Sequence, residues 1–231
     1  MPGKFVALSH QWGSFTQHRK FCTYKKNFEA LQRGIRVTEL PKTFYDAVVV
    51  TRNLGVQYLW IDSLCIIQDD AEDWEKESTL MEQVYSSAYV TIAASCASGT
   101  DDGFLKKRPE RQYVTITTTA GTPYYLCEAI DDFSTDVDHG ELNSRGWVLQ
   151  ERALSRRTIY FTEKQSYWEC GGGVRCETLT KMNKYVLRIS INHPIVQSHL
   201  FNGKSDIFSA EWRPSSGTLI SRIQWSPPSR V

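Results

Sequence analysis

The stretch from Tyr58 to Ser78, YLWIDSLCIIQDDAEDWEKES, constrains the fold more than any other part of the chain. It begins with an apolar run typical of a buried strand, continues through an acidic segment, and ends in a helical pattern. A strand that passes into a helix is the repeating unit of an α/β sheet, and ligands usually bind at the edge where such strands end. We expect the carboxylates of the junction at that edge, and their composition names no ligand. They are Asp62, Asp69, Asp70, Asp73 and Glu77.

The rest of the chain continues the α/β pattern. Residues 5–9, 57–61 and 89–94 are short apolar runs that predict buried strands. Pro41 suits a helix start, and Asp70 suits the N-cap of a helix that runs to about Tyr85. On that second helix, the apolar spacing places Trp74, Met81, Val84 and Tyr85 on one side and charged residues on the other.

The second half is richer in β structure. Residues 113–119 and 124–129 alternate as the strands of a hairpin, and residues 158–162 and 166–169 predict another. Between them lie an acidic segment, 131–141, expected as a solvated loop, and a short helix at 145–153. The predicted fold class is α/β, with a mainly parallel sheet flanked by helices and additional β hairpins toward the C-terminus.

Composition narrows the setting of the protein. With 27 basic and 26 acidic residues, the net charge is +1, so no overall field favours nucleic acid. No apolar run approaches the ~20 residues that span a bilayer, and the N-terminus lacks the apolar core of a signal peptide. The six cysteines are scattered in a chain too long to need disulfides for stability, so reduced thiols are expected. No Cys-x-x-Cys pairing supports a metal site. We expect a cytoplasmic protein without a membrane span.

Two regions differ in pattern. Residues 1–178 carry the periodic segments and are predicted to form one domain. Residues 179–231 form a basic tail that contains many serines and several prolines and lacks clear periodicity, so we expect it to be poorly ordered.

Several ordered blocks resemble the fungal heterokaryon-incompatibility (HET) domain. The match covers roughly residues 4–178, with His10 and Gln11 standing where tyrosine and cysteine are common in that family. The chain begins almost on the first block. The blocks are Val6-Ala-Leu-Ser-His-Gln-Trp-Gly13, Leu40-Pro-Lys-Thr-Phe-Tyr-Asp-Ala47, Leu59 to Asp70, Ser144-Arg-Gly-Trp-Val-Leu-Gln-Glu-Arg152 and Trp168-Glu-Cys170.

The resemblance implies a function in fungal non-self recognition and regulated cell death. The HET domain is similar to the Toll/interleukin-receptor (TIR) domain, which has a flavodoxin-like fold, and some TIR domains cleave NAD with a glutamate that follows a tryptophan. Trp74-Glu-Lys-Glu77 is similar to that arrangement. Glu75 and Glu77 lie about 200° apart on a helix, so at most one faces the cleft, and Glu77 is our choice.

Other polar and aromatic residues near these motifs are further site candidates from their chemistry, although Asp62 could instead orient its loop through backbone N–H groups. Glu77 would be catalytic, and NAD would be a substrate rather than a cofactor. Substrate binding would fall to Ser9, Trp12, Asp62, Trp74 and Arg145. An alternative for Arg145 and Arg152 is an internal ion-pair brace, with Trp147 in the core.

Other functions remain open from the sequence. One is a signalling module that acts through self-association or a receptor-type partner, without chemistry. Another is a truncated, inactive member of the family.

Overall fold

The computed structural model describes residues 3–14, 21–108, 112–121, 123–127, 130–177 and 181–182. Apart from Lys181 and Met182, the predicted tail at 179–231 lies outside these described residues. Within them, no helix is both long enough and apolar enough to cross a membrane.

A six-stranded sheet forms the centre of the fold, in the order β2-β1-β3-β6-β7-β8. The first four strands in this order are mutually parallel, and β7 and β8 are added antiparallel. The strands are β1 (Phe5–Ser9), β2 (Tyr58–Ile61), β3 (Val90–Ala93), β6 (Arg157–Phe161), β7 (Ser166–Cys170) and β8 (Gly173–Cys176). The predicted α/β class is confirmed.

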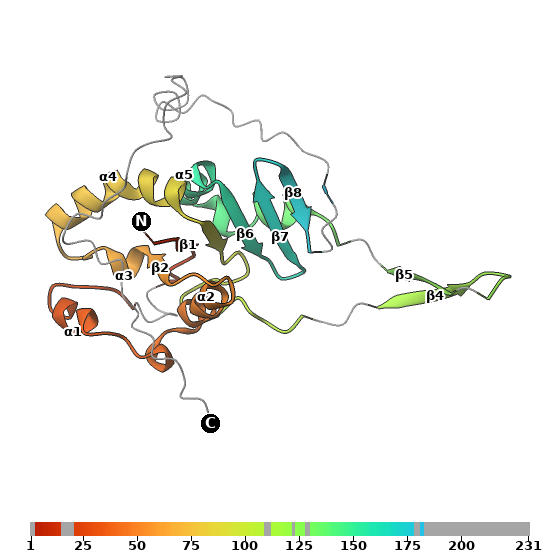
Figure 1. The fold of residues 1–231 in the computed structure, drawn as a ribbon, viewed down its shortest axis with the longest axis horizontal. Helices are drawn as coiled ribbons and strands as arrows, with labels where there is room; N and C mark the ends of the chain where they lie inside the picture. Colours follow the sequence, from red (N-terminus) through yellow and green to blue (C-terminus); the bar gives the residue numbers. More distant parts are fainter. Residues whose placement is uncertain are drawn as a thin grey trace, which may run out of the picture.

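Helices cover both faces of this sheet, as Figure 1 shows. The α-helices among the described residues are α1 (Phe28–Gln32), α2 (Lys42–Asn53), α3 (Asp62–Cys65), α4 (Ala71–Ser87) and α5 (Gly146–Leu154). Alternation along β1 explains the two cores, because successive side chains of a strand point to opposite faces. Val6 and Leu8 pack with Phe44 of α2, whereas Phe5 and Ala7 pack with Tyr85 of α4.

Two junctions differ from the sequence expectation. The short helix α3 stands between β2 and α4, so the strand does not run directly into the long helix. A short 3-10 helix, η1 (Val37–Glu39), also precedes α2. The predicted solvated loop at 131–141 contains the π-helix η2 (Ser134–Asp138) and leads into the 3-10 helix η3 (Leu142–Ser144). Val137 and Leu142 are buried there, and these two apolar side chains hold an otherwise polar segment against the sheet.

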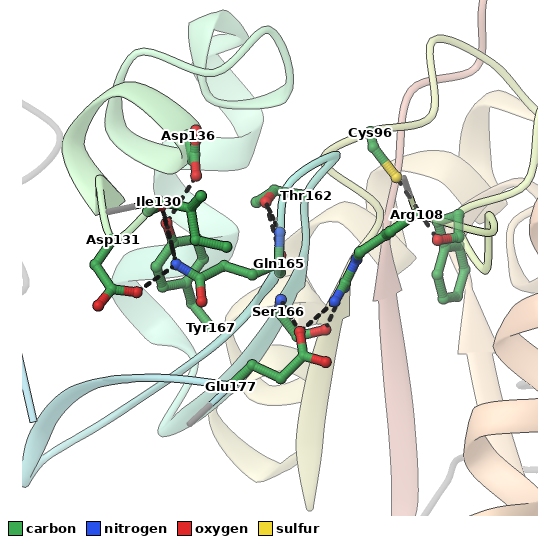
Figure 2. A network of polar contacts seen from close by, with 11 residues as sticks. Cys96, Arg108, Ile130, Asp131, Asp136, Thr162, Gln165, Ser166, Tyr167 and Glu177 are labelled. Carbon is green, nitrogen blue, oxygen red and sulfur yellow. Dashed lines mark hydrogen bonds and ion pairs between the residues drawn. The ribbon is translucent and has the colours of Figure 1, made fainter. Parts of the chain in front are cut away.

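The 130–136 segment is fixed by a network around the fully buried Gln165, shown in Figure 2. The Gln165 amide nitrogen donates to Ile130 O at 3.1 Å, to Asp131 Oδ1 at 2.8 Å and to Tyr167 Oη at 3.0 Å. Tyr167 in turn donates to Asp136 Oδ2 at 2.7 Å. The segment that follows the hairpin at 113–127 is therefore held against β7.

That hairpin, β4 (Tyr113–Thr117) with β5 (Pro123–Cys127), forms a separate two-stranded sheet. It projects away from the rest of the chain in Figure 1. Both strands were predicted from their alternation. β4 ends two residues before the predicted bound, and residues 128–129 of the second predicted strand lie outside the described residues.

Candidate functional site

The strand order reverses at β1, because β2 lies on one side of it and β3 on the other. In open α/β sheets, ligands bind outside the carboxyl ends of the strands at such a reversal. The register aligns Leu8 with Ile61 of β2 and Ser9 with Ala93 of β3. The residues that follow these strands therefore meet at one edge.

Buried polar atoms without a hydrogen-bond partner gather at this edge. Each such atom costs about 1–3 kcal/mol when nothing satisfies it, and proteins rarely leave several together without a ligand or ordered water. Among the described residues, those near the three strand ends are Ser9 Oγ, both ring nitrogens of His10, Gln11 Nε2, Ser63 Oγ, Ser95 Oγ and Glu151 Oε2. We therefore take this edge as the candidate site.

Asp62 is held in a fixed orientation at the end of β2. The Trp12 indole nitrogen donates to Asp62 Oδ2 at 2.9 Å, and the backbone nitrogen of Ser63 donates to Asp62 Oδ1 at 2.6 Å. About a quarter of the Asp62 side chain, 23%, stays exposed. Two residues predicted to bind substrate, Trp12 and Asp62, are thus brought into direct contact at the open side of the edge.

His10 lies beneath this carboxylate and packs edge-on against Phe44, with ring centroids 5.1 Å apart. Its Nδ1 is 3.9 Å from Asp62 Oδ1, which is too long for a hydrogen bond. Burial lowers the pKa of His10, Asp62 partly opposes that shift, and Arg145 adds to it. The ring is therefore neutral at pH 7. Arg145 fixes the same turn, because its Nη1 donates to His10 O at 3.3 Å.

Glu151 is a buried carboxyl at this edge that was not among the predicted site residues. It is 7% exposed on α5 and lies beside Ser9 and Tyr85. Burial raises the pKa of its carboxyl to about 7, with Asp62 raising it further, while Ser9, Tyr85 and Arg145 lower it. The signal was its helical spacing of three from Val148, which is also buried.

Arg152 turns the opposite way and forms a structural brace. It pairs with Asp138 at 2.7 Å and with Glu169 at 3.1 Å, and its guanidinium lies over the rings of Phe133 and Tyr160. Trp147, expected in the core, is instead 62% exposed.

Glu77 and Trp74 occupy opposite situations on α4. Glu77 is 4% exposed, on the packed side of the helix with Val84 and Tyr85, whereas Trp74 is 50% exposed. The expected apolar face is confirmed at Val84 and Tyr85, and Met81 packs partly buried against the same core. Trp74 departs from it, and Glu77 takes an inner position instead. Glu75, the other glutamate considered, is exposed.

The other acidic residues predicted at the 62–77 junction, Asp69, Asp70 and Asp73, accept hydrogen bonds from backbone N–H groups and do not gather at one point. Asp70 caps α4 by accepting from Glu72 N at 3.2 Å, and Asp73 accepts from Ile67 N at 2.8 Å. Asp69 accepts from Lys25 N at 2.7 Å. Within the part of the chain that the structure describes, no group of three or more His, Cys, Asp or Glu side chains is placed to hold a metal ion.

Comparison with known proteins places the chain in a family. Residues 5–151, more than half of the chain, match the family described as heterokaryon incompatibility protein (HET). A curated relative, heterokaryon incompatibility protein 6, OR allele, from Neurospora crassa, is 32% identical over 95 residues, which cover 39% of this chain and 14% of that protein. The chain thus spans a small part of the length of the curated relative it matches. No solved structure matches it significantly. On the match over residues 5–151, the chain belongs to the heterokaryon incompatibility (HET) family.

Proposed function

We propose that this chain is an effector domain of fungal heterokaryon incompatibility that promotes regulated cell death by hydrolysing NAD. The family membership and the printed name of the Neurospora relative support the biological role. The resemblance of Trp74-Glu-Lys-Glu77 to the glutamate-bearing helix of NAD-cleaving TIR domains supports the chemistry.

One observation carries the proposal. Unpartnered buried polar atoms gather where three parallel strands end, and buried carboxylates stand on the two helices packed beside them. Glu77 and Tyr85 are eight residues apart on the packed side of α4, about 12 Å along its axis. A helical side chain leans toward the helix N-terminus, so the Tyr85 phenol extends toward the level of Glu77.

The chemistry asks for little more than a fixed carboxylate. Breaking the nicotinamide–ribose bond develops positive charge on the sugar, and a preorganised carboxylate at Glu77 stabilises that charge. Nicotinamide leaves as a neutral molecule, so no acid has to protonate it. Asp62 and Ser9 would hold polar groups of the substrate, Arg145 its phosphates, and Trp12 and Trp74 its flat rings.

The test is release of nicotinamide from NAD by the purified protein, measured dilute and then artificially clustered. We expect Glu77→Gln, which keeps the side-chain shape, to lower release by roughly 10²-fold or more. Glu75→Gln is the matched control, because it makes the same change on the exposed side of the same helix. Equal loss in both variants, or equal activity in both, would contradict the role of Glu77.

A second candidate function has its own observation. Val114 and Tyr124 of the projecting hairpin are 67% and 56% exposed, and no charged residue occurs between Tyr113 and Cys127. Exposed, uncharged edge strands favour pairing with another chain. A folded protein that releases no nicotinamide in any assembled state would favour a signalling module that recruits partners through such contacts.

A further inference from the structure

Ser9 and Glu151 face each other at the candidate site from distant parts of the chain. Ser9 ends β1, Glu151 lies on the packed side of α5, and both are buried. The Ser9 hydroxyl is near enough to lower the pKa of the Glu151 carboxyl. No direct hydrogen bond of good geometry joins the two side chains, however, and Ser9 Oγ and Glu151 Oε2 each lack a well-aligned partner among the described residues.

A single water molecule satisfies such a pair. A buried water makes two to four hydrogen bonds and is typically held by polar groups that lack other partners. It can donate one hydrogen bond to the Glu151 carboxylate and accept one from the Ser9 hydroxyl. In this arrangement the two side chains fix the orientation of the water molecule, including its remaining O–H bond and its free lone pair.

We infer that Ser9 and Glu151 hold the water molecule that attacks the ribose, and that Glu151 accepts its proton. This inference rests on the proposed NAD hydrolysis and deepens it. As the C1′–N bond breaks, its electron pair passes to the nicotinamide nitrogen and neutralises that ring. The water oxygen bonds to C1′, one water proton passes to the Glu151 carboxylate, and Glu151 later releases it to solvent.

The groups that face Glu151 suit it to this task. Asp62 at the end of β2 raises the pKa of Glu151, and Ser9 of β1, Tyr85 of α4 and Arg145 before α5 lower it. Burial is the largest influence, and the resulting pKa of about 7 lies near working pH, where a general base is most effective. Glu77 would stabilise the sugar cation, so the two carboxylates would have separate roles.

An alternative nucleophile separates these roles. A neutral pyridine such as 3-acetylpyridine attacks C1′ with its nitrogen lone pair and has no proton to lose. We expect Glu151→Gln to lower hydrolysis by roughly 10²-fold and to leave pyridine exchange within about threefold of the wild-type rate. The hydrolysis rate of the wild type should rise toward pH 7 and then level off, and the variant should lose that dependence.

Two further variants test the separate roles of the two carboxylates. Glu77→Gln should lower exchange and hydrolysis together, since both pass through the same cation. Glu141→Gln, which makes the same change at an exposed position, should leave both rates unchanged. Equal loss of exchange and hydrolysis in Glu151→Gln, in a variant that melts like the wild type, would assign Glu151 a merely structural role. A wild type inert in both reactions would overturn the proposed function and this inference with it.

Discussion

At the scale of single residues, the unusual feature is a carboxyl group buried beside a serine and a tyrosine. A buried carboxyl avoids the cost of an unpaired charge by holding its proton to higher pH. Glu151 follows this rule, since burial raises its pKa from 4.5 to about 7. His10 follows the same rule with the opposite sign, since burial lowers its pKa and keeps the ring uncharged.

The raised pKa makes stability depend on pH. A group whose pKa is higher in the folded state stabilises the fold below its unfolded pKa, and this contribution is lost as pH rises through the folded pKa. For Glu151 the loss should run from about pH 4.5 to about pH 7 and total up to about 3 kcal/mol. Urea unfolding at pH 5, 6, 7 and 8 measures it.

Comparison with Glu151→Gln isolates this contribution from that of His10. The glutamine variant should lack the decline, so its advantage in free energy of unfolding over the wild type should grow between pH 5 and 8. The His10 contribution is common to both proteins and cancels in the difference. Parallel stability curves would show that Glu151 ionises in the folded protein as it does in the unfolded chain.

At the scale of secondary-structure elements, local sequence signals succeeded wherever they were strong. The apolar run at Tyr58–Ile61 is β2, and Asp70 is the N-cap of α4 as predicted. The strand β8 and the short helix α3 were missed for different reasons. Gly173 and Arg175 interrupt any apolar run in β8, and the single turn of α3 is too short to show a helical period.

The inner face of α4 was predicted correctly at Val84 and Tyr85, but not in the first turns of the helix. Periodicity identifies a buried face only when apolar residues mark it, and here Glu77 occupies the inner position while Trp74 remains half exposed. The sequence predicted the sheet edge and brought Ser9, Trp12 and Asp62 to it. The sequence patterns did not identify Glu151 as a site residue. Its contact with Ser9 depends on how α5 packs against α4, which no local sequence pattern determines.

The Arg152 brace joins α5 to the antiparallel end of the sheet, and its removal should be costly. Arg152→Met keeps most of the side-chain volume but leaves Asp138 and Glu169 without their shared cation. Breaking a largely buried ion pair from one side typically costs about 3–5 kcal/mol, and we expect a loss in that range in urea unfolding at pH 7. Arg33→Met, at an exposed position just after α1, should cost less than about 0.5 kcal/mol. A similar small cost at both positions would mean that the brace adds nothing to stability.

At the scale of the whole molecule, the six-stranded sheet and the β4–β5 hairpin are separate structures. The sheet carries the hydrophobic cores on its two faces, and the candidate site lies at one edge of it. Within the described part of the chain, β4 and β5 pair only with each other, and they expose Val114, Ile116 and Tyr124. A two-stranded hairpin of this kind is marginally stable by itself and contributes little to the stability of a neighbouring sheet.

Replacing residues 112–127 with a short Gly-Ser linker should therefore leave the sheet intact. We expect the free energy of unfolding to change by less than about 1 kcal/mol, since even halving a flexible loop alters its closure entropy by only about 0.6 kcal/mol. Nicotinamide release by the dilute protein should also be unchanged, because none of the candidate site residues lies between residues 112 and 127. The matched control removes β7 and β8, residues 166–176, whose Tyr167 is fully buried in the core, and that variant should lose its cooperative transition. If the hairpin replacement alone abolished activity in the clustered protein while preserving the fold, the hairpin would be the contact through which copies of the chain assemble.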